Sequence, residues 1–172
     1  MTAPGATTHP SPPAGPAPGP AGAGAGLPGP PAGGTPQATA DWINEAGAQT
    51  LAGRLGITFV EASVDRLVAT MPVAGNHQLY GMLHGGASVT LAESLGSIGA
   101  ALHAGDGHIA VGVDINATHH RAVRSGLVTG VATPLALGRS TATYEVVITD
   151  ETGQRVCTSR ITCALRGRRR RA

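Results

Sequence analysis

Hydrophobic positions follow a helical period in one long stretch near the middle of the chain. Residues 84–103 are mostly small or apolar, and Glu93 is the one side chain among them drawn from Asp, Glu, Lys and Arg. A glycine inside a helix costs about 1 kcal/mol relative to alanine. Gly96 and Gly99 therefore predict that a sheet, another helix or a ligand approaches this helix closely.

Strand-like segments rich in β-branched residues lie on both sides of this helix. A short helix, with Asp41 as its candidate N-cap, precedes all of them. One long apolar helix with six strands predicts an α+β fold in which a curved antiparallel sheet wraps around that helix. The predicted strands cover residues 56–61, 66–73, 108–116, 126–133, 139–149 and 155–165.

The first forty residues differ in composition from everything that follows. They hold eleven of the thirteen prolines, no Asp, Glu, Lys or Arg, and Leu27 as the only sizeable apolar residue after Met1. Such a segment cannot bury enough apolar surface to offset its chain entropy, so we expect residues 1–40 to be a disordered extension. One domain over residues 41–165 and a basic tail over residues 166–172 complete the predicted organisation.

Basic residues are concentrated at the C-terminal end. Five of the twelve Lys and Arg residues lie in the last seven positions, which leaves seven against ten acidic residues in the rest. The body of the chain therefore has no general basic footprint for nucleic acid. We expect the tail to be solvated, with attraction of a polyphosphate ligand as the alternative.

The sequence pattern predicts neither a signal peptide nor a membrane-spanning helix. The start of the chain lacks a basic n-region and an apolar h-region, so it does not predict a signal peptide. The long apolar helix is interrupted by Glu93 and is short for a membrane span. We expect a soluble, cytoplasmic protein without a membrane partner.

Cys157 and Cys163 are the two cysteines of the chain. They form no CxxC motif and have no ligand-like group of histidines and cysteines around them. We therefore predict small core or surface residues, and neither a disulfide nor a metal site.

Glu93 is the first candidate for chemistry. A carboxylate on a mostly apolar helix is costly to bury unless it has a partner or a use. The alternative is an ordinary exposed glutamate. That alternative is weakened because the helix carries no other charged side chain of the four acidic and basic types.

The segment His84-Gly85-Gly86 marks the point where a loop becomes the long helix. The first amides of a helix have no intrahelical partner, and the helix dipole is positive there. Two glycines remove side-chain bulk around those amides, which suits a developing oxyanion on a carbonyl group. A simple tight turn is the alternative interpretation, and the segment alone does not decide between the two.

The spacing of these two groups limits how they can cooperate. Glu93 is nine residues after His84, which corresponds to about 13.5 Å along a helix. One chain can hardly aim both groups at the same carbon atom. If both serve one reaction, two helices packed antiparallel about a two-fold axis must bring them together, which predicts an obligate dimer with two composite sites.

Several other chemistries lack their motifs. The sequence contains no GxSxG of serine hydrolases, no HExxH of zinc hydrolases, and no phosphate-loop or dinucleotide motif. His119 and His120 have no matching acidic partner and are interpreted as residues at a strand end. We predict neither a metal nor a cofactor.

Over residues 41–165 the chain resembles the hotdog-fold thioesterases of the phenylacetate-thioesterase-like superfamily. It is most similar to the branch with the 1,4-dihydroxy-2-naphthoyl-CoA and enterobactin proofreading thioesterases. The similarity continues over residues 112–119, 126–130 and 133–139. The matching pattern is Asn76-x-Gln78-x-x-Gly81-x-x-His84-Gly85-Gly86-x-x-x-x-Leu91-Ala92-Glu93-Ser94-x-Gly96-Ser97.

This resemblance implies a hotdog fold and hydrolysis of an acyl-CoA, above all an aryl-CoA, thioester by a homodimer or a homotetramer. Glu93 would be the nucleophile or the general base, and the Gly85 amide would polarise the thioester carbonyl. The partner chain's Gln78 and His84 would orient the thioester and the water or leaving thiolate, and Ser97 would position the water. Substrate-binding roles would fall to Gly86, His119, Arg121, Arg124 and Arg139.

Two departures from the family pattern and two alternative functions stay open. Leu79 stands where relatives commonly have proline, and Ala136 stands where a histidine is frequent, near the nucleotide. The alternatives are a hotdog hydratase or dehydratase and a non-catalytic acyl-CoA-binding protein. The acyl group, and CoA as opposed to an acyl carrier protein, are not determined by the sequence.

Overall fold

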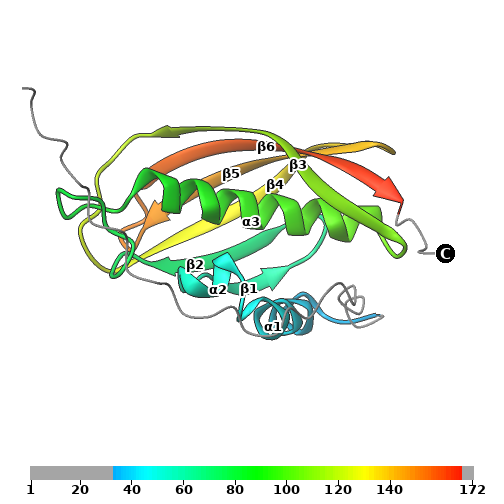
Figure 1. Cartoon of the computed structure of the whole chain (residues 1–172), viewed down its shortest axis with the longest axis horizontal. Helices are drawn as coiled ribbons and strands as arrows, with labels where there is room; N and C mark the ends of the chain where they lie inside the picture. The colour runs from blue at the N-terminus through cyan, green and yellow to red at the C-terminus, as the bar shows by residue number, and fades with distance from the viewer. Residues whose placement is uncertain (1–32, 168–172) are drawn as a thin grey trace, which may run out of the picture.

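Six antiparallel strands curve around helix α3 in the computed structural model, which describes residues 33–167 (Figure 1). The strand order across the sheet is β1-β2-β4-β5-β6-β3, so β1 and β3 are its edges. This arrangement confirms the predicted α+β hotdog fold. The elements are α1 (Pro36–Gly47), α2 (Leu51–Arg54), β1 (Thr58–Ala62), β2 (Leu67–Pro72), α3 (Gly85–Ala104), β3 (His108–His119), β4 (Leu127–Leu137), β5 (Thr141–Asp150) and β6 (Arg155–Gly167).

Small residues on α3 allow the sheet to approach the helix backbone. A Cβ atom on Gly96 would collide with the side chain of Ile161 on β6. A Cβ atom on Gly99 would lie 2.7 Å from the ring of Tyr144 on β5. The predicted close approach is therefore confirmed, and the neighbour is the sheet.

Helix α1 begins earlier than the sequence pattern indicated. Its N-cap is Thr35, whose hydroxyl accepts a hydrogen bond from the Ala38 amide at 3.2 Å, and Pro36 occupies the first helical position. These are favoured residues at a helix start. The prediction of Asp41 as the N-cap was wrong, since Asp41 lies inside the helix and accepts a hydrogen bond from Gln37.

The segment predicted as a disordered extension is only partly within the described residues. Residues 1–32 lie outside them, whereas residues 36–40 form the first turn of α1. At the other end, β6 continues to Gly167, and residues 168–172 of the predicted basic tail again lie outside.

Both cysteines are free and fully buried in the core, so of the two predicted placements, core or surface, the structure has the core. Within residues 33–167, no helix is long and apolar enough to cross a membrane. The same residues contain no group of three or more His, Cys, Asp or Glu side chains arranged to hold a metal ion.

Tyr144 joins the sheet to the loop between β1 and β2. Its ring is fully buried against α3, and its hydroxyl donates a hydrogen bond to the Val64 carbonyl at 2.8 Å. Burial is the main cause that raises the pKa of Tyr144 to about 12. The neutral phenol is thus the form that the fold stabilises.

We expect Tyr144→Phe to lower the free energy of unfolding by about 1 kcal/mol at pH 8, because the hydrogen bond is lost. The wild type should lose stability as the pH rises through 10 towards 12, because its folded-state pKa lies above the ordinary value of 10.0. The variant lacks this loss, so the two proteins should become about equally stable near pH 11. Urea denaturation at both pH values measures the difference, and a constant difference would contradict the assignment.

Candidate active site

Glu93 lies in the middle of α3, partly buried, with its carboxylate turned toward strand β3. A Cβ atom on Gly112 of β3 would collide with the Glu93 Oε1 atom. The absence of a side chain at Gly112 therefore makes room for the carboxylate. One helical turn later, the Ser97 hydroxyl donates a hydrogen bond to Glu93 Oε1 at 3.3 Å.

No cation neutralises this carboxylate within residues 33–167. The two salt bridges of that region are Arg66 with Glu61 and Arg160 with Asp114. A carboxylate held by one hydroxyl beside apolar surface keeps lone pairs for another partner, such as a water molecule or an electrophilic carbon.

The start of α3 leaves one backbone amide for a ligand. The His84 carbonyl accepts hydrogen bonds from the amides of Ala87 and Ser88. The His84 Nδ1 atom accepts from the Gly86 amide at 2.8 Å. The Gly85 amide has no hydrogen-bond partner within the described residues. The geometry thus leaves Gly85 as the free donor, whereas the amide of Gly86, a residue predicted to bind substrate, already has a partner in His84.

The same hydrogen bond fixes the tautomer of His84. Because Nδ1 accepts the Gly86 proton, a neutral His84 ring carries its own proton on Nε2. His84 is exposed, so this N–H group is available to a ligand or to another chain.

The end of β3 packs over the helix start. A Cβ atom on Gly85 would lie 2.9 Å from His119 Nε2, so only glycine fits here without displacing the ring. Gln78, Gly85, His119 and Arg121 line a common cavity of about 330 Å³. The structure thus brings together four of the predicted site residues.

Arg124 has a structural contact in the loop before α3. Its guanidinium donates a hydrogen bond to the Tyr80 carbonyl at 3.2 Å, and its own carbonyl oxygen lies 3.3 Å from His77 Nε2. Gln78 accepts a hydrogen bond from the Tyr80 amide in the same loop. Arg124 therefore braces the segment that carries Gln78.

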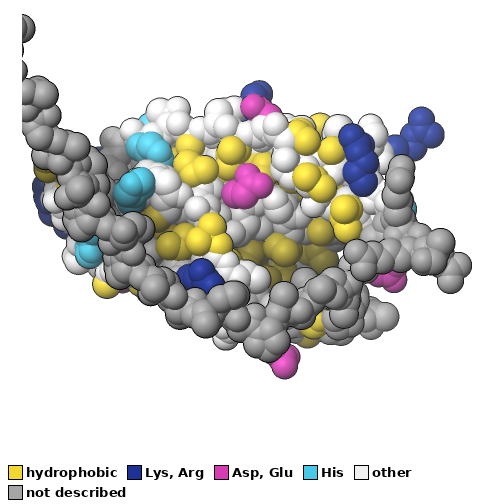
Figure 2. All heavy atoms as spheres, in the orientation of Figure 1, with side chains coloured by type: hydrophobic (Ala, Val, Ile, Leu, Met, Phe, Trp, Pro, Cys, Tyr) yellow, Lys and Arg dark blue, Asp and Glu magenta, His cyan; other side chains and the backbone are white. Residues whose placement is uncertain are grey.

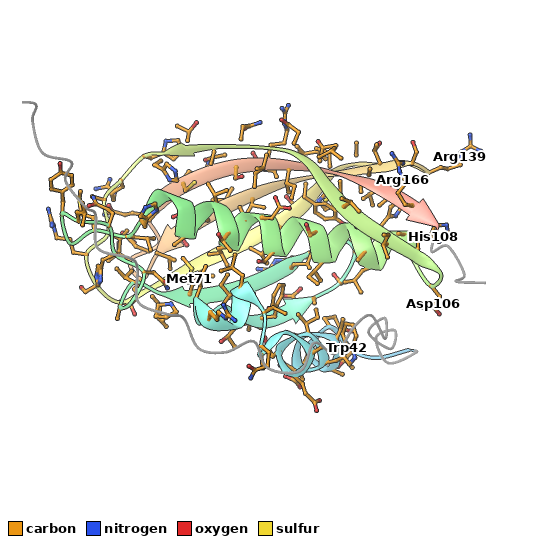
Figure 3. The ribbon with its side chains drawn as sticks, viewed as in Figure 1. Trp42, Met71, Asp106, His108, Arg139 and Arg166 are labelled. Atoms are coloured by element: carbon orange, nitrogen blue, oxygen red, sulfur yellow. The ribbon has the colours of Figure 1, made fainter. Side chains whose placement is uncertain are left out.

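Arg139 lies at the opposite end of the molecule from Arg121. It lines a cavity of about 390 Å³ with His103 and His108, where α3 ends and β3 begins. Figure 3 shows Arg139, Arg166 and His108 near one another at this end. The three arginines predicted to bind substrate do not converge within one chain.

A third cavity, of about 470 Å³, has mostly apolar walls and reaches Ser97, the residue that holds Glu93, although Glu93 itself does not line it. Ser94, Ser97 and Ile98 of α3 form one side of it, and Trp42 of α1 and Phe59 of β1 line the other. The predicted site residues included only Ser97 from this cavity. The recurrence of apolar residues at positions 42 and 46 was a signal for its α1 wall.

Asn44 fastens that wall to the sheet. Its side-chain amide donates to the Phe59 carbonyl at 2.9 Å, and its side-chain oxygen accepts from the Phe59 amide at 2.8 Å. The pair of hydrogen bonds mimics one rung of a β-sheet and holds α1 against β1.

Within one chain, Glu93 and the Gly85 amide remain apart. They are eight residues apart on one straight helix, which is about 12 Å along its axis. Ser97 and Gly85 line different cavities. In Figure 2, histidine side chains gather at the end where α3 begins, and hydrophobic side chains cover the middle of the same face.

Comparison with known proteins places these features in a family. The sequence model of the thioesterase superfamily matches residues 80–157. The proofreading thioesterase EntH of Cronobacter turicensis is 48% identical over 130 residues, covering 75% of this chain and 95% of that protein. The crystal structure of a Haemophilus influenzae thioesterase is 40% identical, with a TM-score of 0.72 over 74% of this chain and 90% of that one.

A second crystal structure, of a mutant thioesterase from Pseudomonas aeruginosa, is 37% identical, with a TM-score of 0.73. It covers 75% of this chain and 94% of that one. The resemblance inferred from the sequence is confirmed by the shared sequence, fold and name of these relatives. The chain belongs to the thioesterase superfamily and is a thioester hydrolase with the hotdog fold.

Proposed function

We propose that this enzyme hydrolyses acyl-CoA thioesters, above all aryl-CoA thioesters, with Glu93 as the nucleophile or the general base. The observation that carries the proposal is the Glu93 carboxylate, seated against Gly112, held by Ser97 and without a cation within the described residues. Ser97 also lines the apolar cavity of about 470 Å³. A carboxylate, a hydroxyl and an apolar cavity are the parts that hydrolysis of a hydrophobic thioester requires.

The second part of the proposed site is the Gly85 amide, which would donate to the thioester oxygen as negative charge develops on it. The lack of a partner for this amide in residues 33–167 supports the role. The Nε2–H group of His84 and the side-chain amide of Gln78 would hold the thioester and the leaving thiolate. Gly86 would leave room for the substrate because it has no side chain. Its amide already donates a hydrogen bond to His84 Nδ1.

A second copy of the chain would bring the two parts together. Strand β3 is an edge of the sheet, paired on one side with β6 alone. Its Ile109, Val111 and Val113 side chains are exposed, which is unusual for an edge strand that faces water. Pairing of two β3 edges about a two-fold axis would join the two sheets and set one chain's Glu93 near the other's Gly85. The proposed unit is a homodimer or a dimer of dimers, that is, a homotetramer.

In such an antiparallel dimer, the helix end of one chain lies near the helix start of the other. Arg139 of one chain and Arg121 of the other would then approach one CoA molecule from two sides. Arg124 would act by bracing the loop that holds Gln78. His119 would border the pantetheine path beside Gly85.

The acyl group would enter the cavity between α1 and α3. Its volume of about 470 Å³ lies in the range of small-molecule sites, and its walls are mostly apolar. Trp42 and Phe59 offer aromatic surface for an aryl ring. Since CoA thioesters are the proposed substrates, we also propose that the enzyme works in the cytoplasm.

The two alternative functions account less well for the Glu93 carboxylate. A protein that only binds acyl-CoA gains nothing from placing a carboxylate without a cation on an otherwise apolar helix. A hydratase would need its acid or base at the α- and β-carbons of the acyl chain. The placement of Glu93 beside Ser97, which can hold a water molecule, favours hydrolysis.

We expect Glu93→Gln to lower kcat for benzoyl-CoA by about a hundredfold or more, the usual scale for loss of a general base. Release of free thiol, followed with a colour reagent, measures the rate. Glu45→Gln changes an exposed carboxylate on α1 and should leave the rate unchanged. Full activity of the Glu93 variant would remove the mechanism.

Mixed dimers test the composite site. Glu93→Gln and Gln78→Ala chains should each be impaired alone, by about a hundredfold for a misplaced substrate. Co-expressed, they should form heterodimers in which one of the two sites has both native residues, so roughly a quarter of wild-type activity returns. Mixing that restores nothing would mean that both residues act within one chain.

Filling the apolar cavity should affect large acyl groups selectively. Ala46→Leu places extra methyl groups in it, and we expect KM for benzoyl-CoA to rise about tenfold while acetyl-CoA hydrolysis is unchanged. Glu45→Leu, on the exposed side of α1, is the matched control. An equal change for both substrates would place the acyl group elsewhere.

A further inference from the structure

A short chain of polar contacts leads from the core of the sheet to Glu93. Cys163 on β6 is fully buried, and its Sγ atom lies 3.8 Å from the Ser97 hydroxyl oxygen. That hydroxyl lies 3.3 Å from Glu93 Oε1. Cys163 is also the register partner of Gly112, the residue against which the carboxylate is seated.

We propose that Cys163 is a positioning residue for Glu93 and acts through the hydroxyl of Ser97. The inference rests on the proposed function, in which Glu93 is the catalytic carboxylate. It adds a residue 66 positions from Ser97 in the sequence, which does not itself line the cavity and would not touch the substrate in the proposed site.

The hydrogen atoms available to the three side chains allow one consistent arrangement. A serine hydroxyl has one hydrogen and can accept others. If Cys163 donates its S–H to Ser97, the serine hydrogen is left for Glu93 Oε1, and the two contacts support each other. Without the thiol, the hydroxyl can turn away, for example to a backbone carbonyl of its own helix.

The thiol is held in the form that can donate. Burial is the largest cause that raises the pKa of Cys163, the Ser97 hydrogen bond offsets part of the rise, and the Glu93 charge adds to it. The thiol therefore keeps its proton at neutral pH.

The sheet register explains why this contact comes from β6. Gly112 on β3 has no side chain, so Cys163 is the one side chain that this register pair presents to α3. The register shifts directly after Gly112, where β3 carries a bulge. The pair thus leaves space for the carboxylate on one strand and offers a hydrogen-bond donor to Ser97 on the other.

Other titratable groups that the sheet turns toward α3 are differently placed. Tyr144 on β5 contacts Gly99, and His119 on β3 contacts Gly85 at the helix start. Asp114 on β3 is exposed and pairs with Arg160 of β6. Of these groups, Cys163 is the one with a contact to a hydrogen-bond partner of Glu93.

Cys157 is a matched control on the same strand. It is also fully buried, and burial is the single cause that raises its pKa. Within the described residues its thiol has no hydrogen-bond partner. Replacing Cys157 removes the same volume from the core without touching the Ser97 contact.

We expect Cys163→Ala to lower kcat for benzoyl-CoA about tenfold with little change in KM. The acid limb of the kcat/KM profile should move to higher pH, because the Glu93 anion loses hydrogen-bond support. Cys163→Ser should restore both values, since it supplies a donor again. Cys157→Ala should lower the melting temperature without moving the acid limb.

Coupling to Ser97 distinguishes positioning from a general loss of packing. In a Ser97→Ala background, Cys163→Ala should have no further effect on kcat or on the acid limb. Cys163→Val, which fills the site with an apolar side chain but has no donor, should behave like Cys163→Ala and serves in its place if that variant does not fold. Circular dichroism and gel filtration establish that each variant retains the native assembly.

The outcomes separate the role of Cys163 from the function on which it rests. Full activity of Glu93→Gln would overturn the proposed function itself. Loss of activity in Glu93→Gln, together with a wild-type acid limb in Cys163→Val, would overturn only the role of Cys163. That role is also overturned if the Cys163 and Ser97 effects simply multiply, or if Cys157→Ala moves the acid limb equally.

Discussion

The structure depends on seating one carboxylate on an apolar helix that packs against a sheet. Glu93 is accommodated because Gly112 has no side chain and because Ser97 offers one hydrogen bond. Burying a charged group without a cation costs free energy, and the fold does not recover that cost through an ion pair in residues 33–167. Such an arrangement is typical of a group kept for chemistry, because proteins tolerate strained or unpaired groups chiefly at functional sites.

A rigid helix also determines where the reaction has to be assembled. Since α3 holds Glu93 about 12 Å from the Gly85 amide, no side-chain rotation in one chain can join them. The sheet ends in β3, an edge with exposed apolar residues, directly beside the carboxylate. Glu93, which cannot reach the Gly85 amide of its own chain, therefore lies next to the β3 edge. A second chain would complete the site through this edge.

The sequence was sufficient for the elements whose pattern is local. The run of small and apolar residues predicted α3 and a close approach to it, without identifying the sheet as the neighbour. Segments rich in β-branched residues predicted the strands, although their ends were placed too early in β3, β4 and β6. Three features were missed or misplaced, of which the first is local and the other two depend on tertiary contacts. The prolines concealed the cap at Thr35, the Asn44 bridge to Phe59 joins segments fifteen residues apart, and the Cys163 contact joins β6 to α3.

The register pair of Gly112 and Cys163 links the fold to the chemistry more closely than either residue does alone. One strand contributes the absence of a side chain, and the other contributes a buried thiol toward the hydroxyl that holds Glu93. A slip of one residue between β3 and β6 would reverse the side-chain faces and remove both contributions together. The alignment of two strands behind α3 is thus a condition for the orientation of the carboxylate, and it links the packing of the sheet core to the proposed reaction centre.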